Sequence, residues 1–180
     1  MIFTLGFFLG VMVAAAPAQP MESQARTQSL DMMEMVKVNE TLAVYKRKHT
    51  QETPLQCQSA KKVHKESDTK YQYNLRARLG SSGSYNSENV EVTLVPKPEG
   101  GYKSTYTQGE IQYTLTLEKM DQNGHCFVIL AEKSSGISGC ELLLPVSQLT
   151  SPIPEVCNEY YNTKCEGRSI DLYKADCKYE

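Results

Sequence analysis

Six cysteines behind an apolar leader constrain this 180-residue chain more than any other feature. One cysteine stands early and five lie in the last third: Cys57, Cys126, Cys140, Cys157, Cys165 and Cys177. Residues 2–16 carry no charge, and Ala16-Pro17-Ala18 has the small-x-small pattern of a signal-peptidase site. We therefore expect residues 1–18 to be a signal peptide. Export to an oxidising compartment would let the cysteines form three disulfides, among 15 possible pairings.

A signal anchor is the alternative, because no Lys or Arg precedes the apolar run. That run is shorter than the roughly 20 residues of a membrane span, and no later stretch is long and apolar enough to cross a bilayer. The sequence thus predicts a secreted protein without a membrane segment after cleavage.

A zinc site is disfavoured, since the cysteines form no Cys-x-x-Cys pair and His49, His64 and His125 are scattered. We expect no metal and no cofactor.

Charge excludes another class of partner. The formal net charge of −2 and a pI near 6.0 argue against nucleic-acid binding, which needs clustered positive charge. The short basic run at 61–65 is interpreted as a solvated strand edge.

A mature chain of about 160 residues suits one domain, which we expect to be monomeric. Asn39-Glu40-Thr41 is an N-glycosylation sequon, so Asn39 is a candidate glycan site.

The chain changes character near residue 39. Residues 19–30 are polar and predict a flexible N-terminal arm, and residues 31–36 allow a helical turn or two. Beyond them, apolar and polar residues alternate with period two, most clearly over residues 70–79, where apolar side chains share one face. This alternation is typical of antiparallel strands with one buried side. Eight strands are expected, near 41–50, 55–65, 69–79, 88–95, 101–107, 110–119, 125–132 and 139–145.

Turn residues separate these strands, with a loop expected over residues 80–89 and an Asn-Gly turn at 123–124. Regular spacing predicts an all-β fold, either an up-and-down barrel or a sandwich. The tail differs: residues 151–155 have the pattern of a helix start with Ser151 as the cap. Cys157, Tyr161 and Cys165 then lie on one helix face, Gly167 is expected to stop the helix, and residues 170–173 favour a short extended piece.

Several motifs resemble those of the tick salivary lipocalins, the tick histamine-binding protein family. Cys126-Phe127-Val128 is followed after twelve residues by Glu141-Leu142-Leu143 and after thirteen more by Cys157. Phe127 stands where the family has an acid, and Leu143 where it has Trp or Tyr. The segments 153–161 and 171–177 are also similar, so the resemblance covers residues 31–177.

The resemblance implies a lipocalin domain over residues 31–180: an eight-stranded antiparallel up-and-down barrel with a C-terminal α-helix packed outside. It also implies the disulfides Cys57–Cys177, Cys126–Cys157 and Cys140–Cys165. The first would close the longest loop and so restrict the unfolded chain most. The other two would clamp the helix onto the seventh and eighth strands.

By the same resemblance, the barrel would hold a small molecule and perform no catalysis. The inward rows supply the candidate ligand-binding residues Tyr71, Tyr73, Leu75, Val92, Leu94, Tyr106, Tyr113, Leu115, Phe127 and Ile129, and the resemblance adds Glu141. Only Glu141 matches the acids with which family members bind amines, and the family's amine-linked Trp is absent because the chain contains no Trp. Glu141 could stay ionised beside Arg76 or Arg78 at a barrel rim, or be neutral. The alternative is that the rows simply fill a packed core.

These residues favour a fatty acid, eicosanoid or sterol over histamine or serotonin, with an amine scavenger as the alternative. The predicted function is capture of a host mediator that drives inflammation or haemostasis. A rival hypothesis is a modulator that binds a host immune protein through the loop at 80–89 and the N-terminal arm.

Overall fold

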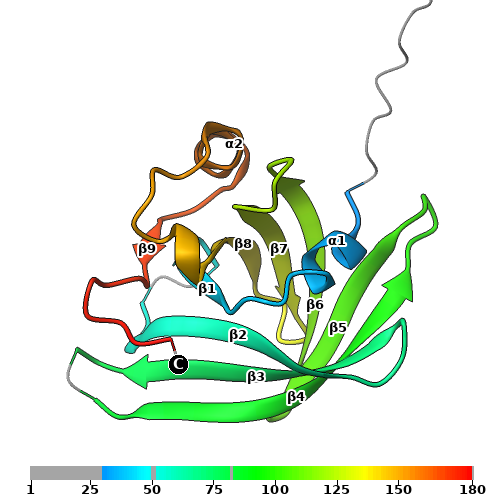
Figure 1. The fold of residues 1–180 in the computed structure, drawn as a ribbon, viewed down its shortest axis with the longest axis horizontal. Helices are drawn as coiled ribbons and strands as arrows, with labels where there is room; N and C mark the ends of the chain where they lie inside the picture. Colours follow the sequence, from blue (N-terminus) through cyan, green and yellow to red (C-terminus); the bar gives the residue numbers. More distant parts are fainter. Residues whose placement is uncertain (1–29, 50–51, 82, 180) are drawn as a thin grey trace, which may run out of the picture.

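A single antiparallel sheet curls into a closed barrel with a helix on its outer side (Figure 1). The computed structural model describes residues 30–49, 52–81 and 83–179; the predicted signal peptide and nearly all of the predicted arm lie outside them. The strands are β1 (Leu42–Arg47), β2 (Leu55–Lys65), β3 (Lys70–Leu79), β4 (Tyr85–Pro96), β5 (Tyr102–Gln108), β6 (Ile111–Met120), β7 (Phe127–Lys133), β8 (Ser138–Pro145) and β9 (Ile170–Asp171). The helices are α1 (Met32–Val36), the 3-10 turn η1 (Val146–Gln148) and α2 (Glu155–Lys164).

Strands β2 to β8 pair with their neighbours in sequence order, and β1 closes the barrel between β8 and β2. The closing β1–β2 contact is short, with Leu42 opposite Ala60 and Ala43 opposite Ser59. The small strand β9 extends the seam by pairing with the far end of β1. This arrangement confirms the predicted lipocalin barrel and excludes the sandwich.

The predicted strand limits are within three residues of the observed ones, and the largest differences are at the end of β1 and the start of β4. Residues 85–89 were expected in a loop, yet they belong to β4 and pair with β3: Tyr85 lies opposite Arg78, and Asn89 lies opposite Asn74. The expectation was wrong because composition alone marks a polar segment as a turn. Cross-strand hydrogen bonding keeps this exposed extension in the sheet, since both strands of a hairpin gain from pairing.

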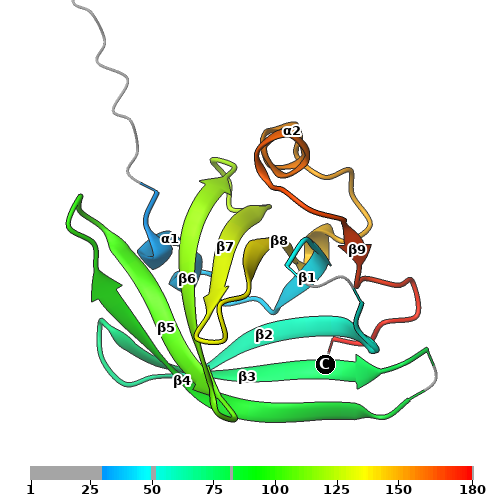
Figure 2. The ribbon, with the colours of Figure 1, turned by 180° about the vertical axis from the view of Figure 1, so that it is seen from behind.

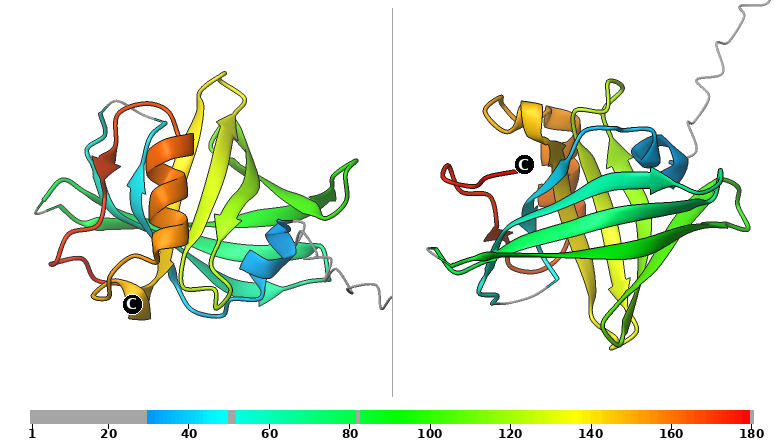
Figure 3. Two further views of the ribbon diagram at one scale, coloured as in Figure 1. Left: turned by 90° about the horizontal axis from the view of Figure 1, so that it is seen from above. Right: turned by 60° about the horizontal axis from the view of Figure 1, so that its bottom comes forward.

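Two hydrophobic layers hold the fold together. The inner cluster fills part of the barrel around Phe127, Ile129 and Leu143. The outer cluster lies between the sheet and α2, which contacts β6, β7 and β8 on their outer side (Figures 2 and 3). Within it Tyr161 is fully buried. Cys157 and Tyr161 share the buried face of α2, as predicted, and Cys165 is also buried in this cluster. The helix ends at Lys164, before the predicted stop at Gly167, and Cys165 is its extended C-cap.

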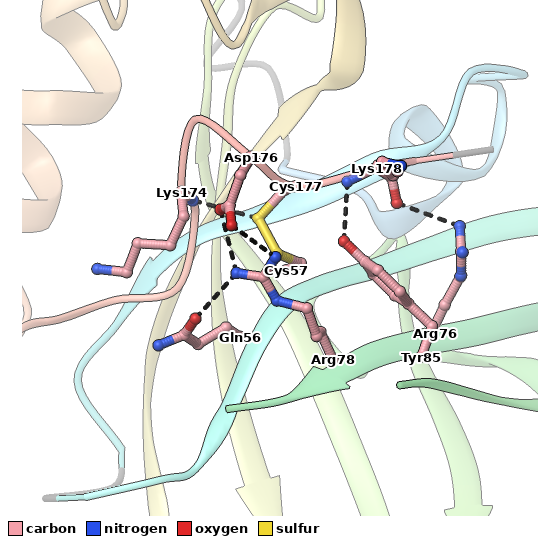
Figure 4. Close-up of a disulfide and its surroundings, with 9 residues drawn as sticks. All are labelled: Gln56, Cys57, Arg76, Arg78, Tyr85, Lys174, Asp176, Cys177 and Lys178. Atoms are coloured by element: carbon pink, nitrogen blue, oxygen red, sulfur yellow. Dashed lines mark hydrogen bonds and ion pairs between the residues drawn. A yellow bond between two sulfur atoms is a disulfide. The ribbon is translucent and has the colours of Figure 1, made fainter. Parts of the chain in front are cut away.

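Three disulfides join the pairs that the family resemblance implied. Cys126–Cys157 and Cys140–Cys165 fasten α2 to the sheet, with Cα–Cα distances of 6.3 and 5.8 Å. Cys57–Cys177 fastens the chain end to β2 across 120 positions. Beside it, Arg78 donates to both carboxylate oxygens of Asp176, at 2.9 and 3.1 Å (Figure 4). The C-terminal segment is thereby held on the outer face of β2 and β3.

The start of α2 differs from the prediction. Ser151 does not cap it; the helix begins at Glu155, and Pro154 occupies the N-cap position without a side-chain hydrogen bond. A residue before proline avoids the helical region. Ser151 precedes Pro152 and Ile153 precedes Pro154, so the chain stays extended until the second proline has passed. Among the described residues, no helix is long and apolar enough to cross a membrane.

The predicted turn at 31–36 is α1, and Asp31 fixes its place. The Asp31 carboxylate accepts hydrogen bonds from the backbone N–H of Met33 and of Tyr102, both at 2.9 Å. The first is an N-cap bond, and the second attaches the helix to the start of β5. One side chain thus both caps the helix and ties it to β5. Figure 1 shows α1 at one end of the barrel.

Candidate functional site

The barrel encloses a cavity of about 510 Å³. Its wall includes residues from α1 and from all eight barrel strands. Because antiparallel strands alternate in direction, β1, β3, β5 and β7 run away from α1, and their last residues gather at the opposite end. The cavity therefore has two chemically distinct ends, which we call the floor, beside α1, and the mouth.

The floor is apolar. Met32, Met35 and Val36 of α1 are all buried and line it. Full burial of a side chain such as Met32 stabilises by roughly 1.5–3 kcal/mol. Lys62 reaches from the end of β2 and donates to the carbonyl of Val36 at 2.6 Å, which satisfies a terminal carbonyl of this short helix. Helix α1 therefore closes this end of the barrel, and its side chains give the floor an apolar surface.

The mouth is polar and charged. Its wall includes Arg76, Asn86, Ser87, Glu88, Gln108 and Lys133. The three β4 residues 86–88 are exposed, which identifies this end as the one facing solvent. Deeper in the cavity lie three charged or titratable side chains: Arg47, His49 and Glu141. The cavity wall thus changes from apolar at the floor to charged at the mouth.

Arg47 and His49 enter the barrel because β1 contains a bulge. Strict alternation from Leu42 and Val44 would place Lys46 inward. The register with β8 shifts between Val44 and Lys46, so Lys46 points out and Arg47 lies opposite Glu141. A bulge adds one residue to a strand and exchanges the faces beyond it. On the outer side, Lys46 and Lys48 instead lie over the Tyr161 ring, at 4.9 and 4.8 Å from its centre.

Glu141 is paired within the cavity. His49 Nε2 lies 2.5 Å from Glu141 Oε1, and the His49 side chain is only 2% exposed. Glycine at 139 permits this contact: a Cβ there would lie 2.6 Å from the Cβ of His49 and 2.8 Å from the carbonyl oxygen of Lys48. The predicted partnership of Glu141 with Arg76 or Arg78 is wrong. Arg78 pairs with Asp176 outside the barrel, and Arg76 donates to the carbonyl of Lys178.

Two tyrosines form a flat wall beside this group. Tyr106 and Tyr113 are directly opposite on β5 and β6, and their rings stack with centres 4.7 Å apart. Burial raises the pKa of both phenols, and the nearby charge of Glu141 raises it further. Both hydroxyls are therefore protonated at neutral pH and are available as hydrogen-bond donors.

The structure brings most of the predicted ligand-binding residues together. Eight line the cavity: Tyr73, Leu75, Val92, Tyr106, Tyr113, Leu115, Ile129 and Glu141. The other three, Tyr71, Leu94 and Phe127, are buried in the inner cluster and are not in the cavity wall. Phe127 packs near the turn at Gly124, and the Tyr71 hydroxyl donates to the carbonyl of Asp68.

Sequence reasoning missed Arg47, His49 and the α1 methionines as wall residues. No periodic signal could reveal the first two, because the bulge reverses the alternation that would be used to find them. The arrangement can hold an apolar body at the floor and a polar group at the mouth. Within the part of the chain that the structure describes, no group of three or more His, Cys, Asp or Glu side chains could hold a metal ion.

Comparison with known proteins agrees with this geometry. The family model of the tick histamine binding protein matches residues 20–179. Among solved structures, the barrel is similar to Japanin from Rhipicephalus appendiculatus bound to cholesterol, with a TM-score of 0.54 and 11% identity over 75% of this chain and 92% of that one. At this identity the likeness concerns the fold. No curated protein sequence matches the chain.

Proposed function

The chain belongs to the tick histamine-binding protein family, and from this premise we propose that it is secreted in saliva and captures a small amphipathic host mediator. The ligand's apolar body lies on the floor beside α1, and its polar end faces the mouth. Fatty acids, eicosanoids and sterols with a polar group have this character. The protein binds its ligand without transforming it, in keeping with its family.

The observation that carries the proposal is the graded wall of the cavity. Ligand pockets are mostly apolar with a few placed polar groups, and typically measure about 300–1,000 Å³. A hollow of about 510 Å³ costs stability, because its lining lacks packing partners. Retention of that hollow, with charges at one end only, supports a binding role over the alternative of a filled core. Japanin's bound cholesterol supports an apolar occupant.

The amine alternative has weaker support. A buried ammonium needs a carboxylate to offset its lost hydration. Glu141 is the acid that matches the family's amine site, and His49 already contacts it at 2.5 Å. Arg47 lies opposite Glu141, and Lys133 also lines the cavity. An added cation would therefore meet positive charge at the place where it needs negative charge.

Native mass spectrometry of protein secreted by animal cells tests the proposal directly. We expect a co-purifying small molecule of lipid mass that is lost on denaturation. The same spectra report whether Asn39, which is exposed between α1 and β1, carries a glycan. A barrel that stays empty after incubation with lipid extract, while the protein binds a host immune protein tightly, would favour the rival hypothesis.

A cavity-filling variant provides the matched control. Leu75 lines the cavity, whereas Leu79 on the same strand is 50% exposed and lies outside its wall. Leu75→Trp should reduce affinity for the fluorescent fatty acid cis-parinaric acid by about tenfold or more, since overfilling costs roughly 1–3 kcal/mol. Leu79→Trp should leave that affinity within a factor of two. Equal effects of the two variants would contradict binding inside the barrel.

A further inference from the structure

Two arginines of this protein are almost equally buried but differ in their partners. Arg78, 6% exposed, donates to both oxygens of Asp176 on the outer face of the barrel (Figure 4). Arg47, 7% exposed, lies in the cavity wall, and its Nη1 donates to the neutral side-chain amide of Gln58 at 3.3 Å. The first charge is neutralised by direct contact, whereas the second meets an uncharged acceptor.

Arg47 also retains unused donor capacity. Its Nε is buried and has no hydrogen-bond partner among the described residues. A buried donor without a partner is destabilising, and more so when the group is charged. Burial lowers the pKa of Arg47, and the charge of Glu141 opposes that effect. Because a guanidinium stays protonated at neutral pH, the cavity contains a permanent positive charge that an anion can stabilise.

The neighbouring charges strengthen this bias. Lys133 lines the same region, and burial followed by repulsion from Arg47 lowers its pKa. Glu141 is the opposing negative charge, and one of its oxygens is engaged by His49. Toward solvent, Arg76 and Glu88 both line the mouth and add one charge of each sign. The region of the cavity around Arg47, Lys133 and Glu141 therefore has more positive than negative charge.

We propose that Arg47 sets the charge preference of the cavity: it favours a ligand with an anionic head group and disfavours a cationic one. A guanidinium presents several donors in a plane and suits carboxylate, sulfate or phosphate oxygens. This inference rests on the proposed function, because it specifies the head group of the captured amphiphile. The bulge in β1 is what brings Arg47 inside, so the preference depends on one inserted residue.

Three probes with one tail and different heads test the inference: dodecanoate, dodecanol and dodecylammonium. Each displaces Nile red, an uncharged reporter dye, from the full-length secreted protein at pH 7.4. The wild-type protein should bind dodecanoate best and dodecylammonium worst. Arg47→Gln should reduce the dodecanoate-to-dodecylammonium affinity ratio by about tenfold or more, because hydrogen bonds to charged groups contribute roughly 1.5–3 kcal/mol. Glu141→Gln should shift the ratio in the opposite direction.

Arg78→Gln is the control, because it removes an arginine of the same burial from outside the cavity and should leave the ratio within a factor of two. Taking a ratio cancels any general loss of folded protein. If the three probes bind with equal affinity, or if Arg47→Gln leaves the ratio unchanged, the charge preference is overturned while capture stands. If none of the probes nor Nile red binds, the proposed function itself fails.

Discussion

The two faces of the barrel wall near β7 and β8 are packed in opposite ways. On the outer face, Tyr161, Cys126 and Cys157 are completely buried, and two disulfides fasten α2 over them. On the inner face, the side chains surround a hollow of about 510 Å³. A binding protein of this size cannot fill its interior without losing its site. The comparison shows that the outer face is filled and cross-linked under α2, whereas the inner face is packed only in part and leaves room for a ligand.

The largest test of this comparison removes one aromatic ring from each face. Tyr161→Ala should lower the free energy of unfolding by about 3–5 kcal/mol, because the ring is fully buried and its loss leaves a cavity beneath α2. Tyr106→Ala should cost only about 1–2 kcal/mol, since Tyr106 already borders a hollow and loses mainly its stacking on Tyr113. Urea denaturation of both variants gives the two values.

Ligand affinity should show the reverse order. Tyr106→Ala should weaken binding of cis-parinaric acid several-fold, whereas folded Tyr161→Ala protein should bind it as the wild type does. Equal stability losses from the two substitutions would contradict the division between a packed outer face and a hollow inner face.

A smaller effect is expected where the two faces meet at Gly139. Gly139→Ala places a Cβ about 2.6 Å from that of His49, so the backbone of one strand must move. We expect a loss of about 1–3 kcal/mol, together with weaker dodecanoate binding because His49 and Glu141 shift. Ser138→Ala, at the exposed preceding position, should change neither property. If Gly139→Ala changed neither stability nor dodecanoate binding, the strands would be able to accommodate the added Cβ, and the tight packing inferred at Gly139 would be contradicted.

The smallest expected effect is on the pH dependence of stability, and it involves only the outer face. The hydrogen bonds from Arg78 lower the pKa of the Asp176 carboxyl below its usual range. A carboxyl with a lowered folded-state pKa contributes stability above its unfolded pKa, near 4, and loses it as the pH falls through the folded value. Asp176→Asn should therefore flatten the decline of the urea midpoint between about pH 5 and pH 2. An unchanged acid slope would contradict a stabilising role for this pair.

Much of the fold could be predicted because its signals are local. Alternation over residues 70–79 predicted β3, and the common face of Cys157, Tyr161 and Cys165 predicted the packing side of α2. The start of α2 was misplaced because two prolines outweigh a serine cap. Residues 85–89 were misread as a loop because strand pairing, which composition does not report, holds them in β4.

The candidate site was predicted less completely. Seven of its residues follow from period-two alternation, which is fixed by the pleat of each strand, and Glu141 was implied by the family resemblance. Tyr71, Leu94 and Phe127 obey the same alternation but lie outside the cavity wall, since an inward direction does not say whether a position is packed or hollow. Arg47 and His49 could not be found in this way, because a bulge has no reliable sequence signature and inverts the pattern after it.

By itself, the sequence determined the eight antiparallel strands, the outer helix and the row of residues facing inward, since each depends on spacing along the chain; the choice of a barrel over a sandwich came from the family resemblance. The tertiary structure decided which of those residues border a cavity and which charges share it. His49 lies 2.5 Å from Glu141 across 92 positions of sequence, and Arg47 joins them only through a shift in strand register. Such contacts depend on how separate strands align, and the energy of that alignment is summed over the whole barrel.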